Sequence, residues 1–171
     1  DKEIEEYLAT KELNLVAQDI TLYGTDRSGR LELPELLTEL AAIEGIAWIR
    51  LLYAYPERLD QRIVEAMAQL DKVCNYLDIP LQHASDRILR RMGRKLKADE
   101  ILQLLAQLRR QIPNITLRSS FIVGFPGETE ADFQELLAFL RLAKLDRIGF
   151  FAYSQEEGTA AARFPDQIPA E

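Results

Sequence analysis

The sequence predicts an α/β fold, a partial (βα) barrel in which five parallel strands are visible. Five short runs of β-branched, aromatic and other apolar residues recur along the chain, and segments with helical periodicity fill the gaps between them. A strand returns parallel to its neighbour only through a crossover connection, which is usually a helix. Because the strands are mostly apolar, we expect both faces of the sheet to be covered.

The elements follow from strand-forming runs, capping residues and apolar spacing. Pro34 suits the first turn of a helix that Gly45 ends, and Asp60 precedes an apolar stripe as an N-cap. The expected strands are Leu13–Asp19, Trp48–Tyr53, Tyr76–Gln82, Thr116–Val123 and Ile148–Ser154. The expected helices are Pro34–Glu44, Asp60–Leu70, Ser85–Met92, Ala98–Gln111 and Glu130–Ala143, and Asp1–Thr10 resembles the end of another helix.

Length and composition indicate one globular domain. The 171 residues are 47% hydrophobic and 29% charged, which is enough to bury a core. We expect residues 1–160 to form the partial barrel and residues 161–171 to be a loose segment leading out of it. No apolar run reaches the ~20 residues of a membrane span, no signal peptide opens the chain, and one cysteine excludes an internal disulfide. These features predict a cytoplasmic protein.

The segment from Ser119 to Thr129 is the most informative part of the chain. It joins an apolar strand to a Gly-Phe-Pro-Gly turn and then to a helix, whose Thr129 and Asp132 have the spacing of a capping box. Ligands of parallel α/β proteins bind at such strand ends. No Gly-Lys-Ser/Thr follows, so the segment is not a phosphate-binding P-loop. A purely structural turn explains the pattern equally well.

Polar side chains gather at the predicted carboxyl ends of all five strands, where a (βα) barrel has its site. They are Gln18, Asp19, Tyr53, Tyr55, Gln82, His83, Arg118, Ser120, Tyr153 and Ser154, with Gly124 at the end of the fourth strand.

Two charged residues interrupt apolar strands. A buried guanidinium at Arg118 needs an anionic partner, which either Asp78 or a ligand carboxylate would supply. With His83 as the single histidine and Cys74 as the single cysteine, no protein-only metal site can be assembled. A lone histidine is more often structural than functional, and the basic stretch from Arg87 to Lys97 is typical of a solvated helix face.

Four stretches of the chain resemble the radical S-adenosylmethionine methylthiotransferases. They are Leu15–Asp19 with Tyr23-Gly24, Tyr76–His83, Ile122–Thr129 and Phe151–Thr159. The resemblance covers nearly the whole chain and implies a barrel of six strand–helix units, of which this chain holds the second to the sixth strand. It also implies two cofactors, S-adenosylmethionine and a 4Fe-4S cluster, that together generate a hydrogen-abstracting radical.

The resemblance assigns cofactor-binding roles by strand order. Gln18 and Asp19 would face the methionine amino group. Gln82 and His83 would lie near the ribose, and Arg118 would meet the carboxylate or the ribose. The adenine would be contacted by Ser120, Ile122 and Gly124. Tyr153 would close the pocket.

The chain departs from the family pattern, because it contains neither the Cys-x-x-x-Cys-x-x-Cys loop that binds the cluster nor the family's amino-terminal and small carboxy-terminal domains. With Asp1 in place of an initial Met, we expect a fragment of an enzyme core that is inactive alone. Gln82-His83-Ala84-Ser85 and Glu156-Glu157-Gly158 are similar to the branch that modifies an aspartate of a small-subunit ribosomal protein.

The net charge of −7 agrees with a basic ribosomal protein as partner and predicts no strong nucleic-acid footprint. The alternatives are a transfer-RNA methylthiotransferase of the same family and a cluster-free βα-barrel enzyme, scaffold or docking module.

Overall fold

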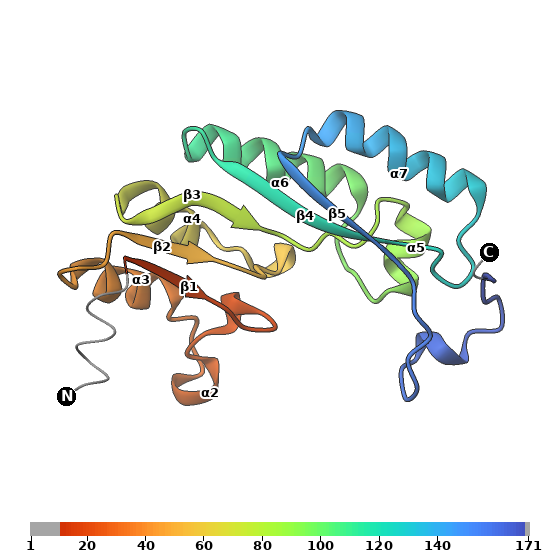
Figure 1. Cartoon of the computed structure of the whole chain (residues 1–171), viewed down its shortest axis with the longest axis horizontal. Coiled ribbons are helices and arrows are strands. Elements are labelled where there is room, and N and C mark those ends of the chain that lie inside the picture. The colour runs from red at the N-terminus through yellow and green to blue at the C-terminus, as the bar shows by residue number, and fades with distance from the viewer. Residues whose placement is uncertain (1–10, 170–171) are drawn as a thin grey trace.

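The computed structural model describes residues 11–169, which form one five-stranded sheet with the strand order β1-β2-β3-β4-β5 (Figure 1). Every neighbouring pair is parallel, which confirms the predicted α/β fold. The strands are β1 Glu12–Leu15, β2 Trp48–Leu51, β3 Val73–Asp78, β4 Thr116–Val123 and β5 Arg147–Ala152. The expected helix end at residues 1–10 lies outside the described residues.

Helices connect the strands. The α-helices are α2 Thr25–Ser28, α3 Leu33–Ala42, α4 Gln61–Gln69, α5 Asp86–Arg91, α6 Ala98–Gln111 and α7 Glu130–Ala143. Three 3₁₀ turns, η1 Ile20–Leu22, η2 Pro56–Arg58 and η3 Ala161–Arg163, follow β1, β2 and β5. Within residues 11–169, no helix is long and apolar enough to cross a membrane.

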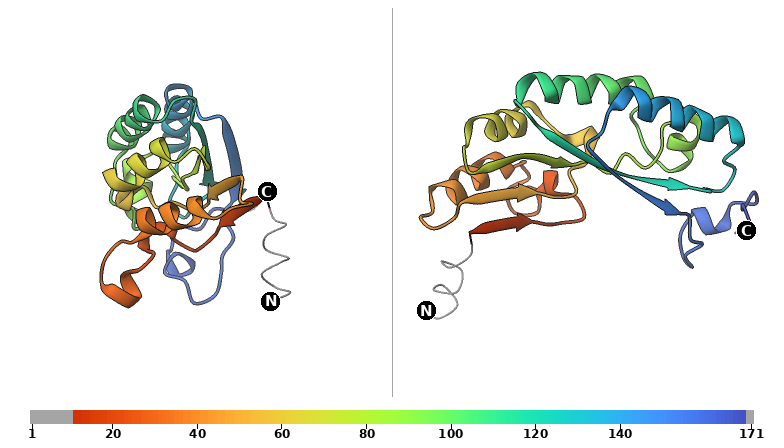
Figure 2. Two further views of the ribbon diagram at one scale, coloured as in Figure 1. Left: turned by 90° about the vertical axis from the view of Figure 1, so that its left-hand side faces the viewer. Right: turned by 45° about the horizontal axis from the view of Figure 1, so that its top comes forward.

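The sheet is curved, and α3, α4, α6 and α7 lie on one side of it (Figure 2). The other side, which we call the open face, has no helix layer within residues 11–169, so the expectation that both faces are covered is wrong. The alternation along β4 shows the reason. Leu117, Ser119 and Phe121 are buried against the helices, whereas Arg118 and Ser120 are half-buried on the open face.

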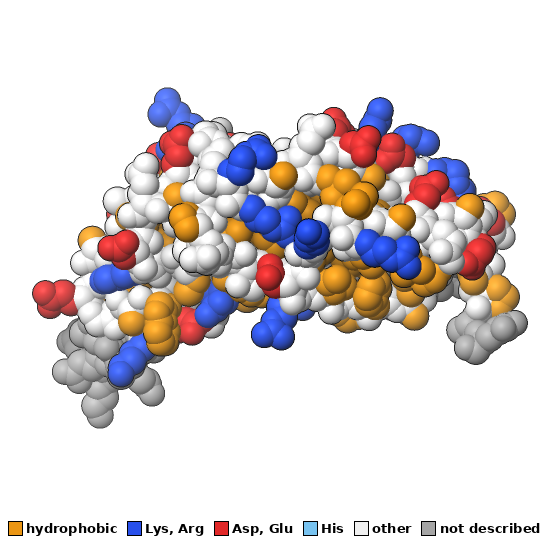
Figure 3. All heavy atoms as spheres, turned by 90° about the horizontal axis from the view of Figure 1, so that it is seen from above, with side chains coloured by type: hydrophobic (Ala, Val, Ile, Leu, Met, Phe, Trp, Pro, Cys, Tyr) orange, Lys and Arg blue, Asp and Glu red, His pale blue; other side chains and the backbone are white. Residues whose placement is uncertain are grey.

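The hydrophobic core lies between the sheet and the helices. Ile49, Leu77 and Leu117 project from the strands and are fully buried. Burial stabilises the fold by about 1.5–3 kcal/mol for each such side chain. Phe121 meets Phe139 of α7 edge to face, with ring centroids 6.5 Å apart. Outside this core, the side of α6 and α7 carries charges of both signs among hydrophobic side chains (Figure 3).

Several predicted boundaries are shifted, most clearly in the third strand. β4, α6 and α7 have the predicted bounds, but β3 begins at Val73 rather than Tyr76 and ends at Asp78 rather than Gln82. Pro80 has no N–H to donate, and Gln82 returns only as an isolated bridge to Phe121. β1 and β2 likewise end before Asp19 and Tyr53, whereas α2, too short to show a period, was not predicted.

Among residues 11–169, β1 and β5 are the edge strands of the sheet, and each pairs with a neighbour on one side. On β5, the exposed fractions of Ile148, Phe150 and Phe151 are 40%, 50% and 57%. The chain beyond β5 turns back across the strand ends, where the backbone N–H of Gly127 donates to the carbonyl of Asp166 at 2.8 Å. Residues 161–169 therefore pack against the domain, and the boundary at residue 160 stays a prediction.

Candidate functional site

The carboxyl ends of the five strands lie along one edge of the sheet because all the strands are parallel. Backbone hydrogen bonds join neighbouring ends. The N–H of Ala54 donates to Asp78 O at 2.9 Å, that of Gln82 to Ser120 O at 2.9 Å, and that of Tyr153 to Val123 O at 2.8 Å. The edge is therefore one continuous surface, as predicted for a shared site.

Three consecutive strand ends turn through left-handed backbone conformations. The φ angles are +59° at Tyr53, +74° at Gln82 and +73° at Gly124. Glycine adopts this conformation at no steric cost, but at the other two residues it costs about 1–3 kcal/mol and is typical of functional sites. Sequence reasoning found Gly124 and had no signal for the strained backbone of Tyr53 and Gln82.

A cavity of about 280 Å³ opens beside the ends of β3 and β4. Gln82, Ile122 and Phe125 line it from the strand ends, and Phe164 closes it from the returning chain. The ring of Phe125 packs edge to face against Tyr153 and Phe164, with centroids 5.3 and 6.1 Å away. This apolar, aromatic wall suits a flat organic group. The Tyr153 hydroxyl is buried and has no protein partner among the described residues.

A larger hollow of about 510 Å³ is lined by residues of α2 and α3, and none of the predicted site residues lines it. Its charged side chains are partly paired with each other, Arg27 with Glu32 and Arg62 with Glu35. No strand end lines it, so the smaller cavity is the better candidate.

On the open face, Asp78 pairs with Arg118, whose Nη1 lies 2.7 Å from Asp78 Oδ2. Asp78 was one of the two predicted partners, and its hydrogen bond raises the pKa of Arg118. The other oxygen, Oδ1, is buried and accepts no hydrogen bond from the described residues. Arg118 is the third residue of β4, so its placement at the strand end is wrong.

A second charged pair lies on the open face, next to the first. Arg50 Nε lies 2.6 Å from Glu12 Oε1, and the guanidinium rests over the ring of Tyr76 at 4.8 Å. Together the two ion pairs place charged side chains on the open face of β1 to β4.

At the end of β1, the carboxylate of Asp19 is already engaged. It accepts from the N–H of Thr21 at 3.0 Å, which caps η1, and pairs with Arg58 at 2.7 Å. Gln18 beside it is exposed. These two residues stand at the predicted edge but do not line the cavity.

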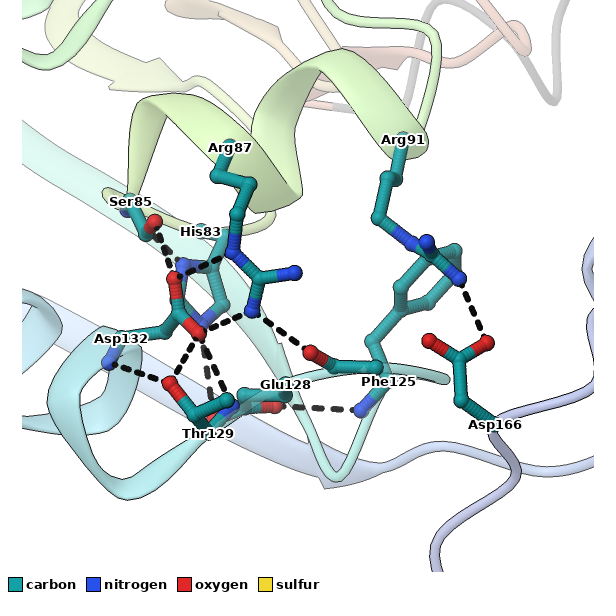
Figure 4. Close-up of polar contacts among 10 residues, drawn as sticks. His83, Ser85, Arg87, Arg91, Phe125, Glu128, Thr129, Asp132 and Asp166 are labelled. Atoms are coloured by element: carbon teal, nitrogen blue, oxygen red, sulfur yellow. Dashed lines mark hydrogen bonds and ion pairs between the residues drawn. The ribbon is translucent and has the colours of Figure 1, made fainter.

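His83 does not line the cavity and lies instead among the polar contacts near the start of α5 and of α7 (Figure 4). Its side chain is fully buried, and Nδ1 accepts from the N–H of Ser85 at 2.9 Å. Nε2 lies 3.5 Å from Glu128 Oε1, and Glu128 Oε2 accepts from the N–H of Phe125 at 3.1 Å. Placing His83 among the exposed polar tips is therefore wrong, because Gln82 alone of this pair reaches the cavity.

Asp132 forms the predicted capping box of α7 with Thr129. The same carboxylate also links α7 to the start of α5. It accepts from Thr129 N at 2.8 Å and Ser85 Oγ at 2.6 Å, and it pairs with Arg87. Burial by itself would raise the pKa of Asp132, but the hydrogen bonds from Arg87, Ser85 and Thr129 lower it well below its usual range.

Two arginines of α5 contact the turn at residues 124–127 and the chain that returns after β5 (Figure 4). Arg87 donates to the carbonyl of Gly127 at 2.6 Å, and Arg91 pairs with Asp166 at 2.7 Å. Gly127 has φ +81°, and a Cβ there would collide with Asp166. Sequence reasoning missed Arg91 and Asp166, because nothing in the sequence places residue 166 beside α5.

The described residues contain no group of three or more His, Cys, Asp or Glu side chains that could hold a metal ion. Cys74 lies half-buried within β3, and burial raises the pKa of its thiol, which disfavours the thiolate that binds metals.

Comparison with known proteins places the chain in a family. The family model of the radical SAM superfamily matches residues 2–140. This chain belongs to the radical SAM superfamily. Its curated relatives include the "Ribosomal protein uS12 methylthiotransferase RimO" of Desulforudis audaxviator, 60% identical over 94% of the chain, and that of Moorella thermoacetica, 58% identical over 94%. The chain spans about a third of their length, 36% and 37%.

Solved radical SAM structures have the same fold. The coproporphyrinogen III oxidase HemN of Escherichia coli matches 94% of the chain with a TM-score of 0.73 and 18% identity, over 36% of its own length. The radical S-adenosylmethionine methyltransferase TsrM of Kitasatospora setae matches 88% with a TM-score of 0.65 and 16% identity, over 29% of its length. These likenesses support the partial radical SAM barrel expected from the sequence.

Proposed function

We propose that this chain is the S-adenosylmethionine-binding core of a radical SAM methylthiotransferase that modifies an aspartate of ribosomal protein uS12. One observation carries the proposal: relatives that bear this name are 50–60% identical over more than 90% of the chain.

The residues at the strand ends fit S-adenosylmethionine. Ile122, Phe125 and Phe164 offer apolar and aromatic surfaces for the adenine, and Gln82 offers an amide to the ribose. Two buried polar atoms, Tyr153 OH and Asp78 Oδ1, have no hydrogen-bond partner among residues 11–169, and a ligand would supply one. When bound, S-adenosylmethionine supplies the radical precursor, and these residues orient it and exclude water.

For the remaining predicted residues we propose the cofactor-binding roles that strand order assigns to them. Gln18 and Asp19 stand at the end of β1, and Arg118 and Ser120 lie on the open face, with Gly124 between β4 and the turn. His83 acts on the cavity from behind, through Glu128.

The residues of this sequence do not fit a 4Fe-4S cluster, which needs several thiolates, because the chain has a single cysteine, Cys74 in β3. We propose that the cluster of the whole enzyme is held by residues outside this sequence.

Ribosomal protein is favoured over transfer RNA as the substrate because the chain is acidic, with a net charge of −7. A phosphate backbone is repelled by such a protein, whereas a basic ribosomal protein is attracted. A ribosomal substrate also places the enzyme in the cytoplasm.

The test uses the full-length enzyme with its cluster reconstituted, incubated with S-adenosylmethionine and either uS12 or transfer RNA. Mass spectrometry should find a methylthio group on an aspartate of uS12. Gln82→Ala should raise the KM for S-adenosylmethionine, and Gln134→Ala, an exposed glutamine of α7, should not. Modification of transfer RNA alone would reject the substrate, and absence of any transfer would reject the activity.

A further inference from the structure

A groove of about 430 Å³ lies between α6 and α7 and shares no residue with the cavity at the strand ends. Its buried lining residues are the apolar Ala84 and Phe139. Leu102 of α6 and Leu142 of α7 continue this apolar surface outwards, and Leu142 is 67% exposed. Hydrophobic side chains reach the surface on this side of the molecule (Figure 3). An exposed leucine that extends an apolar groove is typical of a surface that another molecule covers.

Three carboxylates border this apolar surface, one from each of three helices. They are Asp86 of α5, Asp99 of α6 and Glu135 of α7. Within residues 11–169 none of the three forms an ion pair, and no lysine or arginine lines the groove. The groove therefore carries a negative charge that the described part of the chain does not neutralise, and it attracts a basic partner.

Folding explains two of the three carboxylates. Asp86 and Asp99 lie in the first turns of α5 and α6, where the helix dipole favours negative charge, and Asp86 Oδ1 accepts from the N–H of Ala98 at 2.9 Å. Glu135 lies in the second turn of α7, is exposed and caps no helix. Leu142 follows it on the same face of α7, two turns further on. This face of α7 thus combines a carboxylate and a leucine that the hydrophobic core does not use.

We propose that the groove between α6 and α7 docks a helix of the substrate protein, in which lysine or arginine residues flank an apolar stripe. A helix binds in such a groove through apolar side chains spaced one and two turns apart, which would pack between Leu102 and Leu142. Its basic flanks would face the three carboxylates. This inference rests on the proposed function, which makes a basic ribosomal protein the substrate. Because Ala84 lies only two residues after Gln82, one protein can occupy the groove and reach the strand-end cavity.

The experiment measures methylthio transfer to uS12 by the full-length, reconstituted enzyme and by its Glu135→Lys and Leu142→Ser variants. Each variant should raise the KM for uS12 by about tenfold, because a docking contact is lost or reversed. The kcat and the KM for S-adenosylmethionine should not change, since neither residue touches the strand ends. Added salt should raise the KM of the wild type more steeply than that of Glu135→Lys. Glu39→Lys, the same charge change on an exposed residue of α3, should behave as the wild type.

The outcomes separate this inference from the proposed function. If both groove variants modify uS12 with the KM of the wild type, or if Glu39→Lys raises the KM as much as Glu135→Lys does, the inference fails while the proposed function stands. It also fails if a crystal structure of the full-length enzyme shows the groove filled by another segment of its own chain, or if Glu135→Lys dissolves a dimer in sedimentation velocity runs. A wild-type enzyme that does not modify uS12 overturns both.

Discussion

His83 supports the cavity without reaching it. Because its Nδ1 accepts a hydrogen bond from Ser85, the neutral ring carries its proton on Nε2, which faces Glu128. Glu128 in turn holds the N–H of Phe125, whose ring forms the cavity wall. Within residues 11–169 Nε2 has no hydrogen-bond partner, and at 3.5 Å the Oε1 atom of Glu128 lies within ion-pair distance of it, so His83 stands directly behind the group that holds the wall.

Substitutions that imitate one ring nitrogen at a time separate the two contacts of His83. In the full-length enzyme, His83→Gln places an amide near the Nε2 position and should keep the affinity for S-adenosylmethionine within a few-fold. His83→Asn keeps only the acceptor for Ser85, and should weaken binding by about tenfold, because the buried carboxylate of Glu128 loses the ring N–H that faces it. Equal affinities of both variants, measured by equilibrium dialysis, would show that Glu128 does not transmit the effect.

For single residues, the sequence predicted which kind of partner a side chain requires better than it predicted where that side chain points. The partner of Arg118 could be predicted because a charged residue in an apolar strand requires one, and Asp78 was within reach. The arginines of α5 and its loop could not be separated from a solvated basic face. Whether Arg91 meets Asp166 or Arg94 meets Tyr55 depends on distant segments of the chain.

Among the elements, the junction of α5 and α7 depends on one carboxylate. Asp132 caps α7 and receives donors from Ser85 and Arg87, so its pKa lies below the ordinary value near 3.8. A depressed pKa in the folded state stabilises the protein above the ordinary value, and this contribution is lost as the pH falls below it.

Asp132→Asn should therefore lower the free energy of unfolding by roughly 2–4 kcal/mol at pH 7, because several buried donors lose a charged acceptor. The difference from the wild type should shrink as the pH is lowered below about 4. Urea unfolding across this pH range measures it, with Glu39→Gln, an exposed carboxylate of α3, as the control. A difference that stays constant with pH would disprove the role of the charge.

The elements also show where sequence reasoning ends. β4, α6 and α7 have clear signals at both ends, such as the capping box at Thr129 and Pro113 after α6, and their bounds were predicted. β3 was misplaced because Leu81 and Gln82 continue an apolar, extended run past Pro80, where the ladder has already stopped. The hydrophobic periodicity of a sequence is unchanged when one residue, here Pro80, lacks a backbone N–H donor.

The whole molecule is an open partial barrel with two unprotected edges. Within the described part of the chain, β1 pairs on one side only, and β5 adds apolar side chains on both of its faces. Edges of this kind pair with other chains unless charges or covering segments prevent it.

The isolated chain should therefore associate with rising concentration in sedimentation velocity runs. Phe151→Lys, which puts a charge on the β5 edge, should reduce the association, whereas Leu142→Lys should not, because Leu142 is 67% exposed on α7 and away from the edge. A chain that is monomeric at every concentration and melts sharply at high temperature would contradict the edge argument.

The most direct test of the strand-end site is a crystal structure of the full-length enzyme with S-adenosylmethionine bound. The adenosine should lie in the cavity between Ile122 and Phe125, with Gln82 within hydrogen-bonding distance of the ribose. Adenosine bound on the helix side of the sheet, or at the opposite ends of the strands, would contradict the site.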